Sequence, residues 1–335
     1  MLEFGLSVDT GDSERMMSCI NQAENTGFRY AWIPDVGFCR DIFVLGGVIA
    51  LQTNSIRIGP GVTNPYTRNP AVSALAVATL NEISHGRAVY GIGVGGYATL
   101  TAFGMKTWDR PVTALKEAIE VSRRIFAGDV RDFEGKMFSV GAAGSFLKKP
   151  VSIPICVAVM TGMQSLRIAG ELADGVILAG PLGPDFTRSM IEYVRDSAKS
   201  VGRDPNKIAI HMDALCSVSH EGQRAIDLVK APIARRIIGD ARFYQAVKQA
   251  GVTDDTINKV KQTIGDANTD KLSKLVSSET AENFAVAGTP EQCVEQIREY
   301  NRIGITGMIL DGPYGPGGIE EAVKIAGDEI LPHFR

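Results

Sequence analysis

Two aspartates are the side chains best placed to handle protons, because each lies just beyond a short apolar segment. Asp9 follows Leu2–Val8, and Asp35 comes shortly after Tyr30–Ile33. A carboxyl group in such a place can donate a proton or stabilise a cation that forms during a reaction. Asp35 also has a purely structural interpretation, as a turn residue or a helix cap ahead of Asp41. We favour a catalytic or cofactor-binding role for Asp35, and Asp9 is the second candidate.

The backbone of three loop segments could bind an anion or a flat ring. Gly59–Pro70 is rich in glycine and proline, Gly91–Tyr97 is rich in glycine, and Thr161–Ser165 precedes a helical segment. Glycine lets N–H groups approach a ligand closely, and N–H groups at the start of a helix can hold a phosphate. The structural interpretations of the same segments are a rigid turn, a tight strand–helix turn and a helix cap.

Composition excludes several other classes of protein. The net charge is −3 and no basic run stands out, which argues against nucleic acid as a partner. The 5 cysteines and 4 histidines are scattered, without the spacing of metal ligands, and an odd, dispersed set of cysteines is typical of reduced cytosolic thiols. The sequence shows no signal peptide, and its apolar segment Ile42–Leu51 is too short to span a membrane. We therefore expect a cytoplasmic protein without a metal site.

The candidate residues must be positioned by short apolar strands that alternate with amphipathic helices. The expected strands are Leu2–Val8, Tyr30–Ile33, Ile56–Gly59, Ala88–Ile92, Ile155–Val159, Gly175–Leu178, Ile208–Val218 and Gly307–Leu310. The expected helices are Ser13–Thr26, Ile42–Thr53, Ala71–Ile83, Val112–Ala127, Gln164–Leu172, Pro184–Val201, Pro290–Ile303 and Ile319–Ile330. Ser13 and Thr289 are expected N-caps, while Gly27 and Gly128 follow helix ends.

Repeated strand–helix units predict a parallel sheet, and eight of them in this length favour one closed (β/α)₈ TIM barrel over residues 1–335. Insertions are expected after strands 4 and 7: a hairpin at Arg131–Val140 and a helical insertion at about 221–285. The alternative is an open, doubly wound sheet. It predicts a GxGxxG motif after the first strand, where this chain has only Gly11. In a barrel, the loops after the strands build the active site.

Several blocks of residues resemble the methylenetetrahydromethanopterin reductase family, within the bacterial-luciferase-like barrel superfamily. The most specific block is Thr53–Asn64, which continues through Tyr66–Pro70, and the next is Glu82–Ala88, which leads into Gly91–Gly93. Shorter matches are Leu172–Val176, Val201–Pro205 and Gly288–Glu291. Together these blocks span nearly the whole chain.

The resemblance implies a fold, a cofactor and a reaction. The fold is the TIM barrel, and the cofactor is the deazaflavin coenzyme F-420. The implied reaction moves a hydride to the methylene group of a methylene-tetrahydropterin. It also implies a non-prolyl cis peptide at Gly61–Val62 behind the deazaflavin ring, and a homodimer or higher homo-oligomer. The implied cofactor-binding residues are Asp35, Gly61, Val62, Thr63, Asn64, Gly93, Gly95, Gly96, Tyr97, Thr161, Gly162 and Met163.

The chain departs from the family pattern at three places. Val36 follows Asp35 where the family commonly has histidine, Ser7 stands in the first strand where these reductases carry Glu, and Gly96 stands where they carry Asp. Those carboxylates are the family's natural candidates for proton chemistry. With both missing, Asp35 and then Asp9 are left as the expected catalytic residues.

Other readings of the same residues remain open. They are an FMN-dependent luciferase-like monooxygenase, a flavin-free reductase that uses NAD(P)H, and a cofactor-binding relative without turnover. Arg68 could hold an acidic tail of a ligand or form a salt bridge at the barrel rim. Trp32 and Trp108 could stack on a ring, although core packing is the better prediction for Trp32 inside its strand.

Overall fold

The computed structural model describes residues 1–8, 11–105, 109–129, 131–141, 147, 149–180, 182–239, 247–248, 252–263 and 269–335. Its main sheet is parallel, and the order of its neighbouring strands is β3, β2, β1, β11, β9, β8, β7 and β4. These strands are β1 Glu3–Ser7, β2 Tyr30–Ile33, β3 Arg57–Pro60, β4 Tyr90–Ile92, β7 Ile155–Val159, β8 Gly175–Gly180, β9 Ala209–Val218 and β11 Gly307–Tyr314. All eight predicted barrel strands are therefore present.

The two end strands of this order meet and close the sheet. Parallel bridges join Ile58 to Ala88 and Thr63 to Ile92. The N–H of Thr63 donates to the carbonyl of Gly91 at 3.2 Å. The predicted closed (β/α)₈ barrel is confirmed, and the open doubly wound sheet is excluded.

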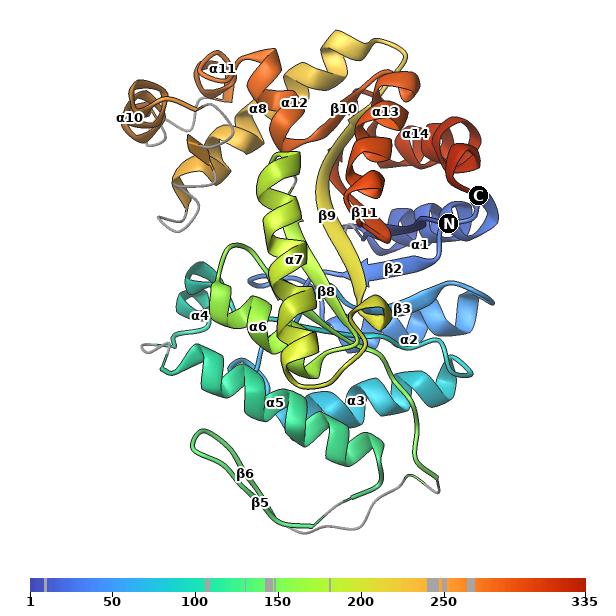
Figure 1. Cartoon of the computed structure of the whole chain (residues 1–335). Helices are drawn as coiled ribbons and strands as arrows, with labels where there is room; N and C mark the ends of the chain where they lie inside the picture. Colours follow the sequence, from blue (N-terminus) through green and yellow to red (C-terminus); the bar gives the residue numbers. More distant parts are fainter. Residues whose placement is uncertain are drawn as a thin grey trace.

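Helices surround the barrel in the order that the alternating pattern predicts (Figure 1). They are α1 Ser13–Thr26, α2 Ile42–Gln52, α3 Pro70–Ile83, α5 Pro111–Phe126, α6 Met163–Leu172, α7 Pro184–Ser200, α13 Pro290–Arg302 and α14 Gly318–Ile325. Short helices lie at α4 Tyr97–Ala102, η1 Pro205–Lys207, η4 Ala326–Ile330 and η5 Leu331–Phe334. The two chain ends lie close together, where the N–H of Leu2 donates to the carbonyl of Phe334.

The helix caps test the local predictions. Thr289 caps α13 in a capping box with Gln292, and Gly27 ends α1 in the left-handed conformation, as expected. The expected cap of α1 was wrong by one residue. Asp12 caps this helix and Ser13 is its first residue, because the Asp12 side chain accepts hydrogen bonds from two backbone N–H groups of the first turn.

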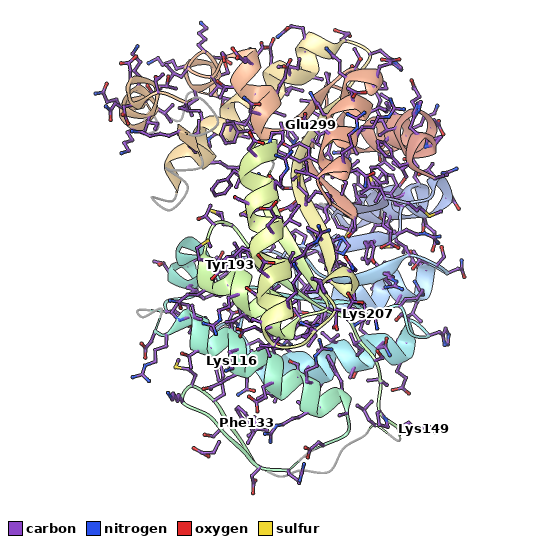
Figure 2. All side chains as sticks on the ribbon, viewed as in Figure 1. Lys116, Phe133, Lys149, Tyr193, Lys207 and Glu299 are labelled. Carbon is purple, nitrogen blue, oxygen red and sulfur yellow. The ribbon has the colours of Figure 1, made fainter. Side chains whose placement is uncertain are left out.

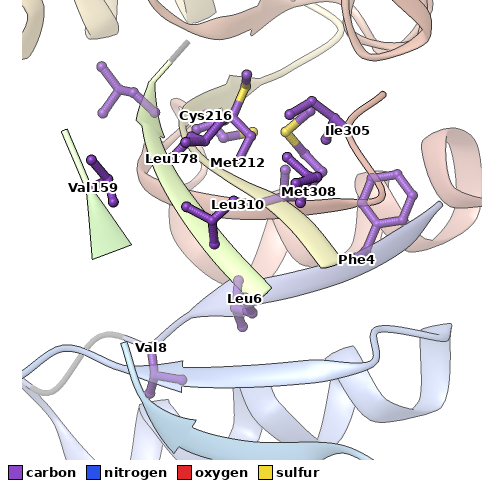
Figure 3. Packing of buried hydrophobic residues seen from close by; sticks show 14 of the residues in the cluster. Phe4, Leu6, Val8, Val159, Leu178, Met212, Cys216, Ile305, Met308 and Leu310 are labelled. Carbon is purple, nitrogen blue, oxygen red and sulfur yellow. The ribbon is translucent and has the colours of Figure 1, made fainter. Parts of the chain in front are cut away.

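Alternation along the strands separates two packed layers. Residues such as Phe4, Leu6, Met212 and Leu310 belong to the large core between the sheet and the helices (Figure 3). A second cluster fills the barrel and consists of Tyr30, Trp32, Val89, Cys156, Ile177 and Ile309. Charged residues such as Lys116 and Glu299 are exposed on the outer helices (Figure 2). This period-2 pattern tells which strand residues can face a ligand inside the barrel.

Two insertions interrupt the repeat where the sequence places them. The predicted hairpin is present as β5 Phe133–Glu134 and β6 Ser139–Val140. It follows α5, which returns the chain to the N-terminal end of the strands, so the hairpin lies away from the C-terminal end of the barrel. After β9 come α8 Gly222–Gly239, α10 Asp254–Thr263, α11 Thr269–Ser273 and α12 Ser278–Phe284. The strand β10, Val286–Gly288, which pairs with β9, was not predicted.

Among the described residues, none of the helices combines the length and the apolar character needed to cross a bilayer.

Candidate active site

The predicted site segments follow β2, β3, β4 and β7, so they meet at the C-terminal end of the barrel, here called the mouth. Two predicted residues cannot be placed there in full. Asp9 lies outside the described residues, and the same is true of the side chain of Tyr97. The other predicted residues belong to loops that the closed barrel brings together.

A hydrogen bond joins two of the predicted residues across neighbouring loops. The hydroxyl of Thr63 donates to Oδ2 of Asp35 at 2.6 Å. Thr63 is buried, while Asp35 is partly exposed at the end of β2. Charge-assisted hydrogen bonds of this kind are stronger than neutral ones. The bond holds the Asp35 carboxylate at the mouth and leaves its second oxygen for another partner.

The backbone behind this pair is tightly packed. The peptide bond between Gly61 and Val62 is cis, as the resemblance implied. A Cβ on Gly61 would lie 2.6 Å from the Cβ of Trp32, so only glycine fits. Trp32 is buried in the barrel and stacks on Tyr30 with ring centroids 5.5 Å apart, which confirms core packing for this residue. Trp108 lies outside the described residues.

Two other predicted side chains are engaged by the protein itself. Asn64 is buried and its carbonyl oxygen accepts hydrogen bonds from the N–H groups of Tyr66 and Thr67. Arg68 lies 3.2 Å from Oδ2 of Asp41 and stacks over the ring of Phe43. Asn64 therefore shapes its own loop, and Arg68 forms the salt bridge at the rim that was one of its two interpretations.

The glycines of the loops after β4 and β7 leave space at the mouth. A Cβ on Gly96 would have its nearest contact at 3.9 Å, and one on Gly162 would have its nearest at 3.6 Å. Gly96 is the N-cap residue of α4 and Gly162 that of α6, and no described side chain caps either helix. The packing of the chain does not itself require glycine at these two places. The space and the N–H groups of α6 are therefore available to a ligand.

Large apolar side chains surround the same opening. Phe38 in the loop after β2 is 81% exposed, and its ring lies 5.1 Å from that of Phe103, just beyond α4. Met160 and Met163, on either side of Thr161 and Gly162, are about half exposed. Exposed aromatic and thioether side chains suit the faces of planar ligands.

Sequence reasoning missed a carboxylate pair inside the barrel. Asp213 lies on β9 and Asp311 on β11, and Nη2 of Arg236 on α8 lies 3.5 Å from Oδ2 of Asp311. Burial and the nearby charge of Asp311 raise the pKa of Asp213 to about 7, and Arg236 opposes this shift. A signal was available, because His211 and Asp213 interrupt an apolar strand at alternate positions.

A second polar group lies at the N-terminal end of the barrel. The hydroxyl of Tyr30 donates to Oε2 of Glu3 at 2.9 Å, and the guanidinium of Arg57 lies 5.7 Å from the centroid of the Tyr30 ring. His211 is buried edge-on against Tyr30 and Trp32. Burial lowers the pKa of His211 to about 4, so its imidazole is neutral at pH 7.

The fold and the mouth together define a class of protein: a closed (β/α)₈ barrel whose opening combines glycine-lined space, apolar rings and carboxylates. In the described part of the chain, no three His, Cys, Asp or Glu side chains gather as a metal site would require. Residues 3–307 match the luciferase-like monooxygenase family. The chain belongs to this family.

Individual relatives are similar over nearly their whole length. The chain is 32% identical to the 5,10-methylenetetrahydromethanopterin reductase of Archaeoglobus fulgidus, over 94% of each chain. It is 33% identical to the enzyme of the same name from Methanolobus tindarius, over 92% of this chain and 93% of the other. The structure of the coenzyme F-420-dependent tetrahydromethanopterin reductase from Methanopyrus kandleri superposes with a TM-score of 0.92. It is 29% identical and covers 100% of this chain and 99% of that one.

Proposed function

We propose that the protein is an oxidoreductase that transfers a hydride between coenzyme F-420 and the methylene group of a methylene-tetrahydropterin. The observation that carries this proposal is the similarity to reductases of that name across almost the entire chain. A match of this extent includes the mouth of the barrel as well as its scaffold. Bound coenzyme F-420 would supply a carbon centre that accepts or releases a hydride.

The residues at the mouth fit a planar ring with a phosphate-bearing tail. Val62, Thr63 and Gly93 would lie against the ring, beside the Asp35 carboxylate. Gly95 and Gly96 would line its edge, since a Cβ on Gly96 would meet its nearest described atom only at 3.9 Å. Thr161, Gly162 and Met163 would hold the phosphate, because α6 begins there with no capping side chain among the described residues.

The protein's own work in such a reaction is positioning and electrostatics. The apolar side chains at the rim would hold the rings of cofactor and substrate face to face and keep water from the reacting carbon. The carboxylate of Asp35, held by Thr63, would stabilise positive charge that develops on the substrate. Both tasks need rigid placement, which the closed barrel provides.

A cofactor titration tests the proposal directly. Purified protein is titrated with coenzyme F-420 and, separately, with FMN, and absorbance and fluorescence are followed. The proposal expects tight binding of the deazaflavin. It also expects that methylene-tetrahydromethanopterin oxidises the bound, reduced deazaflavin in a single turnover. Tight binding of FMN alone would contradict the proposal and favour the monooxygenase alternative. Reduction of methylene-tetrahydromethanopterin by NADPH, with neither coenzyme F-420 nor FMN present, would favour the flavin-free reductase.

A matched pair of variants localises the cofactor. Gly162→Val places a side chain at the start of α6, where, among the described residues, a Cβ meets only Ser165. We expect the affinity for coenzyme F-420 to fall by roughly tenfold or more, since the phosphate loses its place. Gly141→Val is the control. It follows the hairpin, no atom of the described residues lies within 4 Å of its Cβ position, and the variant should leave the affinity unchanged. Equal affinities in both variants would move the phosphate site elsewhere.

The proposed assembly is a homodimer or a higher homo-oligomer. Val44 and Leu51 of α2 are 68% and 77% exposed, and Val72 and Leu75 of the adjacent α3 are also exposed. An apolar face of this kind on two neighbouring helices fits a second copy of the chain. Light scattering of the native protein should give a multiple of the chain mass, and Leu51→Lys should reduce it. A monomer at micromolar concentration would contradict this assembly.

The proposed location is the cytoplasm. All five cysteines are described, and none forms a disulfide. Cysteines that are not joined in disulfides are typical of proteins in reducing compartments. Fractionation of native cells with an antibody tests this directly, and recovery in the membrane or extracellular fraction would contradict it.

A further inference from the structure

The carboxylate pair inside the barrel is fixed by strand register. Asp213 of β9 pairs with Ala179 of β8 on one side and with Ile309 of β11 on the other. Asp311 pairs with Leu215, two residues beyond Asp213. The two side chains therefore point to the same face, and the two residues are offset by about 6 to 7 Å along the direction of these neighbouring strands. Ile309 belongs to the cluster that fills the barrel, so this face is the inner one.

The place of the pair along the barrel is toward the mouth. Asp311 lies beyond Ile309, in the half of β11 that leads to the loop at the C-terminal end of the strand. Asp213 is partly exposed, whereas its neighbours Met212 and Ala214 are buried. On the β8 side its neighbour is the small side chain of Ala179, while Ile309 lies beside it on β11. A substrate ring that enters the mouth can therefore approach Asp213.

The charged and titratable groups around Asp213 come from three elements. Asp311 faces it from β11, Arg236 lies beside Asp311 from α8, and His211 is two residues back on its own strand. Strand β8 offers Ile177 and Ala179, and β1 offers only Gly5 and Ser7 at this level, none of which carries a charge. Among the described residues, the guanidinium is thus the single cation beside the pair, and it contacts Asp311.

This arrangement makes the two carboxylates unequal. Arg236 compensates the charge of Asp311 directly, while Asp213 has an enclosed position and a like charge beside it. Both effects favour the protonated carboxyl group, and the pKa of Asp213 rises to about 7. His211 is neutral at the same pH. Asp213 therefore holds a proton near neutral pH that an ordinary aspartate would have lost.

We propose that Asp213 is the acid that protonates the substrate when its methylene bridge opens, and that Asp311 and Arg236 position and tune it. The inference rests on the proposed function. One C–N bond of the bridge breaks, and its electron pair takes the proton of the Asp213 carboxyl group. The methylene carbon, left as an iminium cation, then accepts a hydride from the reduced deazaflavin and becomes a methyl group. The substrate gains a proton and a hydride, and the carboxylate of Asp213 regains a proton from water.

The need for such a group follows from the chemistry of the step. A nitrogen that leaves carbon without a proton would carry negative charge, so an acid within reach accelerates bond cleavage by roughly 10² to 10⁴. The first strand ends in Ser7, which does not titrate near neutral pH. Asp35 accepts a hydrogen bond from Thr63 and suits the role of an anion. Asp213 and Asp35 would then divide the work, one as the acid and the other as the counter-charge.

The test compares full-length wild type with Asp213→Asn, Asp213→Glu and Ser217→Ala, which alters a buried hydroxyl on the same strand. Single-turnover oxidation of the bound, reduced deazaflavin by methylene-tetrahydromethanopterin is followed from pH 5.5 to 8.5. We expect the wild-type rate to fall as pH rises through about 7. Asp213→Asn should lose roughly 10² to 10⁴ in rate and all of this pH dependence. Asp213→Glu should restore part of both, and Ser217→Ala should match wild type.

Two readouts do not depend on turnover. The affinity for oxidised coenzyme F-420 should stay within about threefold of wild type in Asp213→Asn, because the acid serves the substrate. In cofactor-free protein with ¹³C-labelled aspartate carboxyl groups, one resonance should titrate near pH 7 and should be missing from Asp213→Asn.

The outcomes separate the two proposals. If wild type turns over, two results overturn the assignment of the acid but leave the proposed function standing. One is a fully active Asp213→Asn, and the other is a slow Asp213→Asn that keeps the wild-type pH profile. The absence of a carboxyl resonance that titrates near pH 7 does the same. A wild-type protein that binds the deazaflavin but does not reduce the substrate overturns the proposed function, and the acid falls with it.

Discussion

His211 and Asp213 lie two residues apart on β9 and face the same barrel interior, yet they belong to different ends of it. His211 lies toward the N-terminal end, where Tyr30 contacts Glu3, Arg57 and His211 itself. Asp213 lies toward the mouth, where the one guanidinium beside the pair, among the described residues, contacts Asp311. At the N-terminal end, the polar side chains contact one another through Tyr30 and fill the barrel interior. At the second end, a like charge is left beside Asp213.

The two ends differ in how burial changes the pKa of the titratable side chain that each contains. At the N-terminal end, burial keeps the imidazole of His211 neutral, and Glu3 and Arg57 each contact Tyr30. At the mouth, burial and Asp311 keep a proton on a carboxyl group near pH 7. A buried polar group that is neutral at pH 7 contributes to folding stability. A carboxyl group with a pKa near 7 can exchange a proton with a ligand.

The largest expected effect is a pair of opposite pH slopes in folding stability. The folded pKa of Asp213, about 7, lies above its unfolded value, so its contribution is fully present below about pH 4 and lost as pH rises through 7. The folded pKa of His211, about 4, lies below its unfolded value, so its contribution is present above about pH 6.5 and lost as pH falls through 4. In wild type the two slopes largely cancel between pH 4 and 7.

A variant that lacks either Asp213 or His211 should show the pH dependence of the unfolding free energy that the other residue causes. Relative to wild type, Asp213→Asn should gain roughly 2 to 4 kcal/mol of unfolding free energy between pH 4 and 7, while His211→Gln should lose roughly 2 to 3 kcal/mol over the same range. Urea unfolding of the cofactor-free protein at several pH values measures both. If the unfolding free energies of the two variants changed with pH in the same direction, Asp213 and His211 would not have opposite effects on stability.

A smaller effect is expected when one methyl group is added at each end of the barrel and the changes in folding stability are compared. A Cβ on Gly307, at the N-terminal end, would lie 2.1 Å from Nδ1 of His211, so Gly307→Ala must displace a packed ring. We expect a loss of about 1 to 3 kcal/mol in unfolding free energy. Gly96→Ala at the mouth meets its nearest described atom only at 3.9 Å and should change stability by less than about 0.5 kcal/mol. Equal losses, measured by urea unfolding, would remove the distinction between a sealed end and an open one.

Sequence patterns were sufficient for the scaffold because it depends on local signals. Tyr30–Ile33, Ile155–Val159 and Ser13–Thr26 have the predicted bounds, since apolar runs and capping residues mark them. The errors lie where two local signals compete or where none exists. Asp12 and Ser13 are both good caps, and only the backbone decides between them. The three residues of β10 are a strand because β9 pairs with them.

The mouth was predicted in part for a related reason. Asp35, Thr63 and Gly162 lie in loops, and in a barrel every loop after a strand reaches the same end. Asp213 lies within a strand, so its role depends on which face of β9 turns inward and on which residue of β11 lies beside it. Those facts are set by register across the sheet, between residues almost a hundred positions apart.

The smallest expected effect tests the tuning of Asp213 by its two neighbours. Asp311→Asn removes the like charge, so the pKa of Asp213 should fall and the pH at which the reduction rate declines should move down by about one unit. Arg236→Gln removes the compensating cation, so the same midpoint should move up. The pH profile of single-turnover reduction measures both, and each variant serves as the control for the other. Shifts in the same direction would mean that a group other than Asp213 sets the profile. Opposite shifts would show that the charges of Asp311 and Arg236 set the pH at which this carboxyl group at the mouth loses its proton.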